Sequence, residues 1–318
     1  MAFAGLEVQA VGHDTRGDDD DDDETKTAYV YVTRGTKAAL RDLPEEIGDV
    51  RVRVVNVGRL AIRLEAASGK TTNRPHLFEH NGRIACGSSC APSGEAYSGT
   101  FGAIVQVAND ADIFLLSNNH VFGACNHTPI GQPIMSPSAA DSAPNMRVPT
   151  AIGKHENIVE LRSGDPDLVE PVREDVAIAR VTHGRLVSSW QGDDIDGFDT
   201  PTDVVAPRSG MRVKKYGRTT GLTLGEVESF VLTGQPLPYD SRYFKGTVWV
   251  EQTWTIRGDN GLFALPGDSG SLVVTEDGTA AVGLLFAESN KGQYGWIVPL
   301  DHVMRQFGGL TLVSGHGV

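Results

Sequence analysis

The chain has 318 residues, 40% of them hydrophobic and 22% charged, which is the composition of an ordinary globular protein of about two domains. Its 28 basic and 41 acidic residues give a formal net charge of −13, so bulk charge favours binding neither to nucleic acid nor to an anionic membrane surface. No apolar run approaches the roughly 18 residues that a membrane-spanning helix requires.

Residues 1–25 are predicted to form a flexible acidic segment. The opening stretch, MAFAGLEVQAVG, lacks the basic start and the continuous apolar run of a secretory signal peptide. The stretch that follows, RGDDDDDDETK, carries repelling carboxylates that should keep it extended and solvated. The chain also has three cysteines, an odd number that argues against a fully paired disulfide framework. Together these features predict a cytoplasmic protein.

Residues 26–97 are predicted to form a small α/β appendage and a connector. Polar and apolar side chains alternate in AYVYVT at 28–33 and again in VRVRVVNV at 50–57, which is typical of strands. Between them, residues 37–42 suit a short helix that ends before a proline.

From residue 98 onward the sequence predicts an all-β core. Short runs of β-forming residues alternate with Gly, Pro, Asn and Asp, a texture typical of barrels and sandwiches. The expected strands are 100–107, 113–117, 175–181, 211–216, 226–232, 247–255, 271–274, 280–286 and 294–298. Helical periodicity returns only at 301–307.

A serine between two glycines stands out in LPGDSGSLVV, residues 265–274. The flanking glycines let the backbone approach a substrate closely and can aim two N–H groups at one point. Acyl transfer needs that geometry, because negative charge develops on the oxygen of the attacked carbonyl. Ser269 is therefore a candidate nucleophile.

A serine nucleophile needs a base, and the base needs an orienting carboxylate. His120, at the end of the apolar run in LLSNNHV, offers the base. Asp175 opens the strand of EDVAIARV, where a barrel core can hold it rigidly. Asp165 and Asp167 are the alternatives for the carboxylate, but their Gly-Pro-rich SGDPD context is less suited to holding a side chain rigidly.

In that order along the chain, LSNNHV, DVAIARV and GDSGS resemble the three catalytic segments of the chymotrypsin-like (trypsin-like) serine proteases. The stretch GRTTGLTLGEV is similar to the opening hairpin of the second barrel in bacterial members of that family. YVTRGTKAALRDLP and VGLLFA resemble an intracellular branch that includes the narrow-leaf proteases of plants. The resemblance implies two six-stranded antiparallel β-barrels: an N-terminal one at 98–182, a linker at 183–208, and a C-terminal one with a terminal helix at 209–318.

The resemblance also implies the roles of the residues that match the motifs. His120 would be the general base, Asp175 its orienting carboxylate and Ser269 the nucleophile. The backbone N–H groups of Gly267 and Ser269 would form the oxyanion hole, and Asp268 would serve a structural purpose beside them. The activity implied is that of a serine endopeptidase acting on proteins or peptides, with no cofactor and no metal.

Two departures from the family pattern concern the substrate-binding residues. The strand that offers Ser-Trp-Gly to substrate in the family reads Phe286-Ala287-Glu288 here. Phe263 stands where an acid usually lies at the base of the specificity pocket, and Gly295 should line the same pocket. We expect Glu288 to point outward into solvent, and the pocket to prefer a small or medium apolar side chain.

The sequence leaves the state of Cys86, Cys90 and Cys125 open. They could form a structural metal site completed by His80 or His127, since such sites normally have four ligands. Cys125 could instead pair with either of the others, or all three could be buried thiols. The last of these is the reading we favour.

Two other classes of function remain open from the sequence. The chain could be a protease fold retained as a non-catalytic scaffold for binding or assembly, although three matched catalytic residues argue against it. An esterase could use the same triad, but the Gly-x-Ser-x-Gly elbow of typical lipases is absent. The sequence leaves the substrate unidentified and allows a homo-oligomer.

Overall fold

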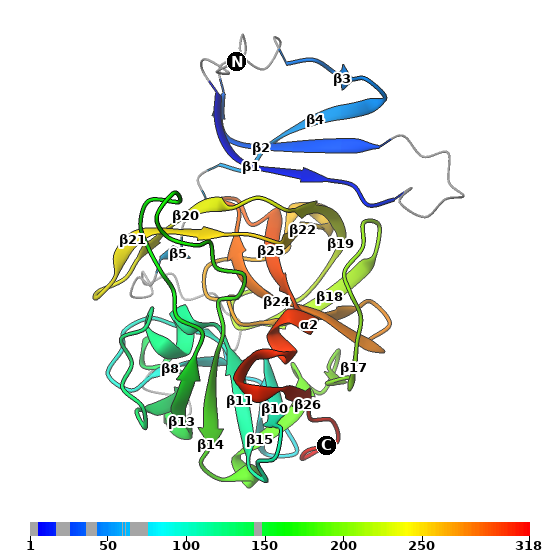
Figure 1. The fold of residues 1–318 in the computed structure, drawn as a ribbon. Coiled ribbons are helices and arrows are strands. Elements are labelled where there is room, and N and C mark those ends of the chain that lie inside the picture. The colour runs from blue at the N-terminus through cyan, green and yellow to red at the C-terminus, as the bar shows by residue number, and fades with distance from the viewer. Residues whose placement is uncertain are drawn as a thin grey trace.

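The computed structural model describes residues 6–16, 26–35, 43–58, 60, 62–63, 76–142 and 148–318. Almost all regular structure in these residues is β-strand, arranged as two β units with a further sheet stacked at one end (Figure 1). The predicted all-β architecture is therefore confirmed. The helix expected at 37–42 lies outside the described residues.

The second β unit is a closed six-stranded antiparallel barrel. Its strands follow the order β18-β23-β24-β25-β22-β19, and pairing of β18 with β19 closes the ring. The bounds are β18 (Arg212–Gly217), β19 (Gly221–Val231), β22 (Thr253–Gly258), β23 (Leu272–Thr275), β24 (Ala280–Glu288) and β25 (Tyr294–Pro299). The helix α2 (Leu300–Met304) follows directly. As expected, GRTTGLTLGEV forms the turn and first half of the β18–β19 hairpin.

The first β unit is a curled half-barrel, and together with the closed barrel it makes up the double-barrel architecture expected. Its strand order is β26-β10-β11-β14-β13-β12-β8-β9. The bounds are β8 (Ser89–Pro92), β9 (Gly99–Thr100), β10 (Ala103–Val107), β11 (Ile113–Ser117), β12 (Pro133–Ser136), β13 (Thr150–Ile158), β14 (Ala177–Val181) and β26 (Leu310–Leu312). The last strand corrects the expected domain boundary, because the chain returns after α2 to pair β26 with β10.

The segment expected to be a linker, 183–208, contains strands of its own. β15 (Val187–Gln191) pairs in parallel with β7 (Arg83–Cys86), and β16 (Phe198–Asp199) and β6 (Glu79–His80) complete this sheet. β17 (Asp203–Val204) adds to β24. A loop-rich composition masked these short pairings, because only two to five residues of each strand take part.

The N-terminal sheet corrects the prediction that residues 1–25 are flexible. β1 (Leu6–His13) pairs antiparallel with β2 (Thr27–Gly35), and His13 also pairs with Phe230 of β19. β2 pairs in parallel with β4 (Val50–Asn56), which pairs with β3 (Glu46–Ile47). The sheet is therefore joined to β19 of the second barrel through the one residue pair of His13 and Phe230. Backbone pairing supplies the order that the acidic composition did not suggest; the aspartate run itself lies outside the described residues.

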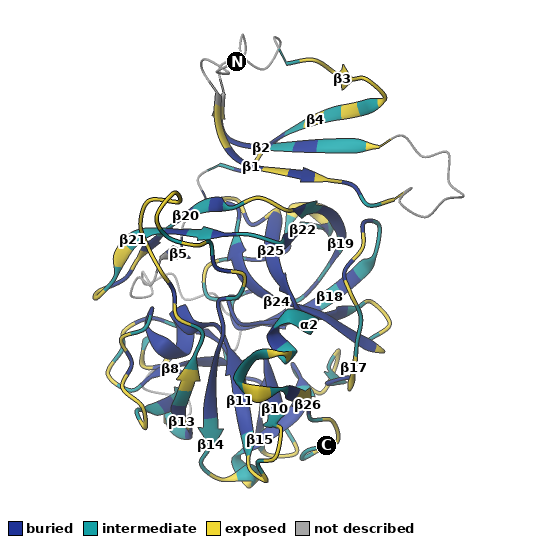
Figure 2. Cartoon of the chain, in the orientation of Figure 1, coloured by how far each residue is buried: buried dark blue, intermediate teal, exposed yellow. Residues whose placement is uncertain are grey.

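A buried tyrosine fastens this sheet to the second barrel. Tyr31 on β2 is fully buried, and its hydroxyl lies 2.9 Å from a carboxylate oxygen of Glu228 and 2.8 Å from each of the hydroxyls of Ser229 and Thr255. Most other positions of the sheet are half-buried or exposed, whereas the strands of the two β units are largely buried (Figure 2). Most of the hydrophobic core thus lies in the β units, although one core cluster also takes in Ala10, Tyr29, Tyr31 and Val55 of the N-terminal sheet.

A separate hairpin lies against the second barrel and carries a residue of the candidate site. β20 (Gln235–Asp240) pairs with β21 (Lys245–Val250), and β5 (Ile62–Arg63) adds to β20 in parallel. The single strand predicted at 247–255 is in fact β21 and β22, separated at Gln252, whose φ of 56° takes the backbone out of the extended region. The remaining short helical turns are η1 (Asn119–Gly123), η2 (Ala139–Asp141), η3 (Gly184–Leu186), η4 (Asp259–Gly261) and η5 (Gln306–Gly308).

Candidate active site

His120 lies in a single helical turn that begins where β11 ends. This turn, η1, places the imidazole in the interior with only 1% of the residue exposed. Asn119 fixes the turn: its amide nitrogen donates to the carbonyl of Val159 at 2.7 Å, and its amide oxygen accepts the N–H of Asn126 at 3.0 Å. The polar residues around His120 in the sequence therefore hold its backbone rather than contact solvent.

Asp175 directs the imidazole. It is fully buried just before β14, and its Oδ2 lies 2.5 Å from Nδ1 of His120. Its Oδ1 accepts the backbone N–H of His120 at 3.1 Å. Because a carboxylate can only accept, the proton of the neutral ring sits on Nδ1 and Nε2 is left as the acceptor. That is the tautomer a general base needs.

The alternatives for the carboxylate do not reach the histidine. Asp165 and Asp167 lie in an exposed turn, where the Asp165 side chain accepts the backbone N–H of Asp167 at 3.0 Å.

Tyr239 is a residue of the site that the sequence did not reveal. From β20, its hydroxyl donates to Oδ2 of Asp175 at 2.9 Å, and its ring meets that of His120 edge to face at a centroid distance of 6.0 Å. Burial raises the pKa of Tyr239 well above its ordinary value, so the hydroxyl stays protonated as a donor. Nothing in QPLPYD marks this tyrosine, because the contact depends on how the hairpin packs.

Ser269 lies on the loop before β23 and is 7% exposed. Its carbonyl accepts the backbone N–H of Thr100 at 2.8 Å, and the next residue, Gly270, packs so closely that an added Cβ would meet Oγ of Ser117 at 2.2 Å. Ser117 ends β11, three residues before His120. The loop of Ser269 and the turn of His120 therefore meet between the two β units.

The hydroxyl of Ser269 is hydrogen-bonded to a group other than His120 or Asp175. Its Oγ donates to the carbonyl of Phe286 at 3.3 Å, and within the described residues no hydrogen bond joins it to His120. Catalytic hydrogen bonds are often long or misaligned without substrate and tighten when substrate binds. The bond to Phe286 is weak, so a rotation of the serine side chain would release it.

Two backbone donors beside Ser269 are unoccupied. Within the part of the chain that the structure describes, the N–H groups of Gly267 and Ser269 have no hydrogen-bond partner. Gly267 has φ = 99°, a conformation that other residues rarely adopt. The N–H groups predicted to form an oxyanion hole thus lie beside the Ser269 side chain and are free to bind a ligand.

Asp268 shapes this loop, as the family resemblance implied. Its Oδ1 accepts the N–H groups of Thr219 at 2.8 Å and Thr220 at 3.1 Å, and its Oδ2 accepts the N–H of Leu265 at 3.0 Å. Nζ of the fully buried Lys215 lies 3.5 Å from Oδ2. The carboxylate ties the serine loop to the β18–β19 turn and is compensated by a buried cation.

Phe263 occupies space in which a specificity pocket was expected. Its side chain is fully buried, and a Cβ added at Gly295 or Gly225 would lie 2.7 Å or 3.0 Å from its ring. The other expected substrate-binding residues include Phe286 and Ala287, both buried on β24. The aromatic ring is thus part of the core of the second barrel, and it leaves little room for a deep side-chain pocket beside Gly295.

Glu288 is half-buried, which differs from the outward, solvated position expected for it. Burial raises the pKa of its carboxyl to about 8; the charge of Asp268 adds to this, while Lys215 opposes it. Because the charges of the buried Lys215 and Asp268 already balance each other, the protonated form of Glu288 has the lowest free energy at neutral pH.

This carboxyl makes stability depend on pH in a defined direction. Its pKa rises from 4.5 to about 8 on folding, so the native state binds one more proton than the unfolded state between these values. Stability from this group is therefore full at low pH and is lost as pH rises toward 8. We expect Glu288→Gln to flatten that decline and to stabilise the protein at pH 8.5 by roughly 1–3 kcal/mol, a range reduced for partial exposure. Urea unfolding at pH 5 and 8.5 measures this; an unchanged pH slope in the variant would contradict it.

The cysteines are resolved in favour of free thiols. Cys86, Cys90 and Cys125 are unpaired and buried, which excludes the disulfide considered for Cys125. Burial raises the pKa of each thiol well above its ordinary value, so they are poor nucleophiles. Within the described residues, no group of three or more His, Cys, Asp or Glu side chains is placed to hold a metal ion. No helix in these residues has both the length and the apolar character needed to cross a membrane.

No protein-family model matches the chain. Among solved structures, the chain is similar to Thermobifida fusca protease A, with 18% identity, a TM-score of 0.48 and coverage of 73% of this chain and 100% of the other. It is also similar to a Nocardiopsis protease, with 17% identity, a TM-score of 0.47 and coverage of 72% and 97%. A glutamic acid-specific serine protease gives 18% identity, a TM-score of 0.47 and coverage of 72% and 100%. With similarities this distant, function has to be argued from the site itself.

Proposed function

We propose that the chain is a serine endopeptidase that hydrolyses peptide bonds through Ser269, His120 and Asp175. The observation that carries the proposal is the buried pair of His120 and Asp175, which fixes the imidazole with Nε2 free. A histidine kept merely for packing would not need its ring held by a carboxylate that also binds its own backbone.

The residues present account for each step of acyl transfer. Oγ of Ser269 attacks the carbonyl carbon of the scissile bond while Nε2 of His120 takes its proton, and the N–H groups of Gly267 and Ser269 bind the resulting oxyanion. His120 then gives the proton to the leaving amine as the C–N bond breaks. Water, deprotonated by the same nitrogen, attacks the ester and releases Ser269. Asp175 stabilises the imidazolium throughout without taking a proton.

We propose that the residue before the scissile bond is small or medium-sized and apolar. The ring of Phe263 fills the depth beside Gly295, so a long side chain would have to displace it from a close-packed core. An arginine or lysine would also lose hydration there without a fixed ionised partner, because the raised pKa of Glu288 keeps its carboxyl neutral near pH 7.

Labelling with a fluorophosphonate probe tests the reaction class. We expect stoichiometric modification of Ser269 in the wild-type protein and none in Ser269→Ala, followed by cleavage of a proteome-derived peptide library after small apolar residues. Absence of labelling and of turnover would favour the non-catalytic scaffold. Turnover of simple esters without peptide cleavage would favour an esterase. Dominant cleavage after arginine or lysine, abolished in Glu288→Gln, would overturn the proposed specificity.

We also place the protein in the cytoplasm. Three free, buried thiols suit a reducing compartment, since secreted proteins of similar cysteine content usually pair them.

A further inference from the structure

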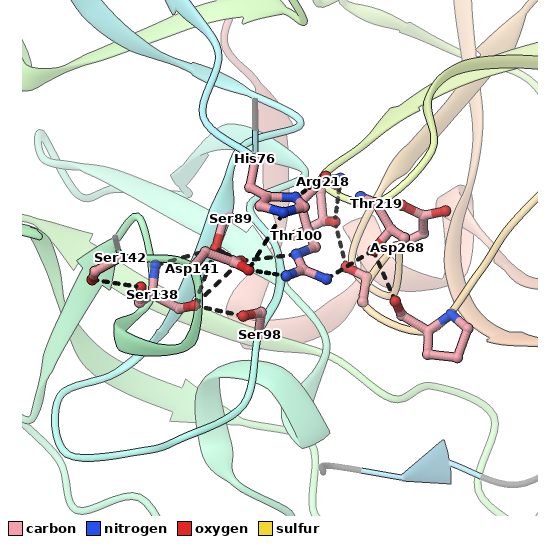
Figure 3. A network of polar contacts seen from close by, with 12 residues as sticks. His76, Ser89, Ser98, Thr100, Ser138, Asp141, Ser142, Arg218, Thr219 and Asp268 are labelled. Carbon is pink, nitrogen blue, oxygen red and sulfur yellow. Dashed lines mark hydrogen bonds and ion pairs between the residues drawn. The ribbon is translucent and has the colours of Figure 1, made fainter. Parts of the chain in front are cut away.

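A buried ion pair joins the two β units directly behind the oxyanion loop. Asp141 ends η2 in the first unit, and Arg218 lies in the β18–β19 turn of the second; they are 6% and 8% exposed. The guanidinium holds the carboxylate with two parallel bonds: Nε donates to Oδ2 at 2.9 Å, and Nη2 donates to Oδ1. Figure 3 shows this pair at the centre of a polar network that reaches Asp268. Such a fork fixes the plane of the guanidinium as well as its position.

Asp141 is held ionised and in place from the side of the first β unit. Burial raises the pKa of its carboxyl, but attraction to Arg218 and hydrogen bonds outweigh this and lower the pKa below its usual value. The hydroxyl of Ser89 donates to its Oδ2 at 2.5 Å. His76 bridges the pair: Nδ1 donates to the carbonyl of Arg218 at 3.0 Å, and Nε2 lies 3.9 Å from Oδ1 of Asp141 (Figure 3). These contacts hold the Asp141–Arg218 ion pair rigidly in place.

Arg218 is linked through Thr219 to the peptide that precedes Gly267. Its Nη1 donates to Oγ1 of Thr219 at 2.9 Å, and that hydroxyl donates to the carbonyl of Pro266 at 2.8 Å. The direction is fixed because arginine can only donate and a hydroxyl has a single proton. In the trans peptide between Pro266 and Gly267, the N–H points away from the carbonyl. Holding the carbonyl toward Thr219 therefore aims the N–H of Gly267 to the opposite side.

A second arm fixes the peptide that follows Gly267. The backbone N–H of Arg218 donates to Oγ1 of the buried Thr100 at 3.2 Å, and that hydroxyl donates to the carbonyl of Gly267 at 2.8 Å. The guanidinium also packs against the glycine itself, since an added Cβ would lie 2.6 Å from Nη1. Both peptides of Gly267 are thus tied to one arginine.

We propose that Asp141, Arg218 and Thr219 form a positioning relay that holds the Gly267 N–H in the oxyanion hole. The inference rests on the proposed peptidase function and adds the residues that pre-organise its electrostatic stabilisation. None of the three touches the reacting atoms; each acts through the orientation of the Pro266–Gly267 peptide. Because Asp141 belongs to the first β unit, the relay also makes the oxyanion hole depend on the packing of the two units.

The test compares Thr219→Val, which keeps the shape but removes the hydroxyl, with Thr219→Ser, which restores it. We expect Thr219→Val to lower kcat by roughly 10- to 100-fold with little change in KM, because the oxyanion exists only beyond the ground state. Thr219→Ser should recover most of the rate. Thr311→Val, on an exposed position of β26, serves as the matched control and should behave as wild type.

A second measurement separates the oxyanion hole from the triad. An ester and its thionoester share a leaving group, but sulfur accepts hydrogen bonds more weakly than oxygen. Loss of the aimed N–H should therefore slow ester turnover more than thionoester turnover, so that the ratio of their kcat/KM values falls. A disturbed triad would slow both substrates equally and leave the ratio unchanged.

The outcomes divide cleanly. A wild-type kcat in Thr219→Val, failure of Thr219→Ser to recover the rate, or an unchanged ester-to-thionoester ratio would each overturn the relay while leaving the peptidase function intact. A wild-type protein that hydrolyses no acyl substrate would overturn the proposed function itself. If Thr219→Val does not fold, as judged by its thermal transition, Thr100→Val cuts the other arm; we expect the same fall in the ratio there, and an unchanged ratio would overturn the proposal.

Discussion

Replacing Ser269 or His120 with alanine should abolish peptide hydrolysis, with a loss of kcat on the order of 10⁶-fold. The two losses should be similar in size and should not add in the double variant, because nucleophile and base act as one unit. Initial rates on a cleaved peptide, with thermal unfolding as the check on folding, measure this. If both single variants kept even a tenth of the wild-type rate, the site would not be a triad.

Substitutions of the residues that hold the His120 ring should lower kcat by graded amounts. Asp175→Asn should cost roughly 10⁴-fold in kcat, because an amide can no longer hold the proton on Nδ1 of the ring. Tyr239→Phe removes only one donor to Asp175 and should cost about tenfold. Asp165→Asn and Asp167→Asn, in the exposed turn, are the matched controls. If either control variant were inactive and Asp175→Asn active, the orienting carboxylate would be misassigned.

The three residues of the proposed triad can be picked out from the sequence because their signals are local. Ser269 stands between glycines that its loop requires, and Asp175 opens a strand whose alternation is plain to read. Tyr239 cannot be picked out in this way. Its role depends on the β20–β21 hairpin packing so that the Tyr239 hydroxyl reaches Asp175, and a tertiary contact of that kind cannot be predicted from the six residues of β20.

The N-terminal sheet shows the same difference between what a local pattern predicts and what tertiary contacts decide. The composition of residues 1–25 is dominated by aspartates, yet residues 6–13 form β1, whose order comes from backbone pairing with β2 and β19. Tyr31 shows alternation in the sequence, but its three polar partners come from the second barrel, roughly 200 residues away. Periodicity identifies a strand, whereas its partners are decided by the whole fold.

Lys215→Met should produce the largest loss of stability among single substitutions near the site. Lys215 is fully buried, with Nζ 2.7 Å from Oγ1 of Thr220 and 3.5 Å from Oδ2 of Asp268. Burial lowers the pKa of its ammonium group against the attraction of Asp268, so desolvation is the dominant cost of the pair. Methionine keeps an unbranched side chain only one atom shorter but removes the charge that compensates the buried carboxylate.

We therefore expect the free energy of unfolding to fall by about 3–5 kcal/mol in Lys215→Met, measured by urea denaturation at pH 7. Lys214→Met is the matched control. The Lys214 side chain points to the other face of β18, is only half-buried and lies over the ring of Phe198. Its substitution should therefore lower the free energy of unfolding by less than about 1 kcal/mol. Adding Asp268→Asn to Lys215→Met should cost less than the sum of the two single changes, because the second substitution removes the charge that the first left unpaired. Strictly additive losses would mean that the two groups do not compensate each other, and that Asp268 is stabilised by its backbone and hydroxyl donors alone.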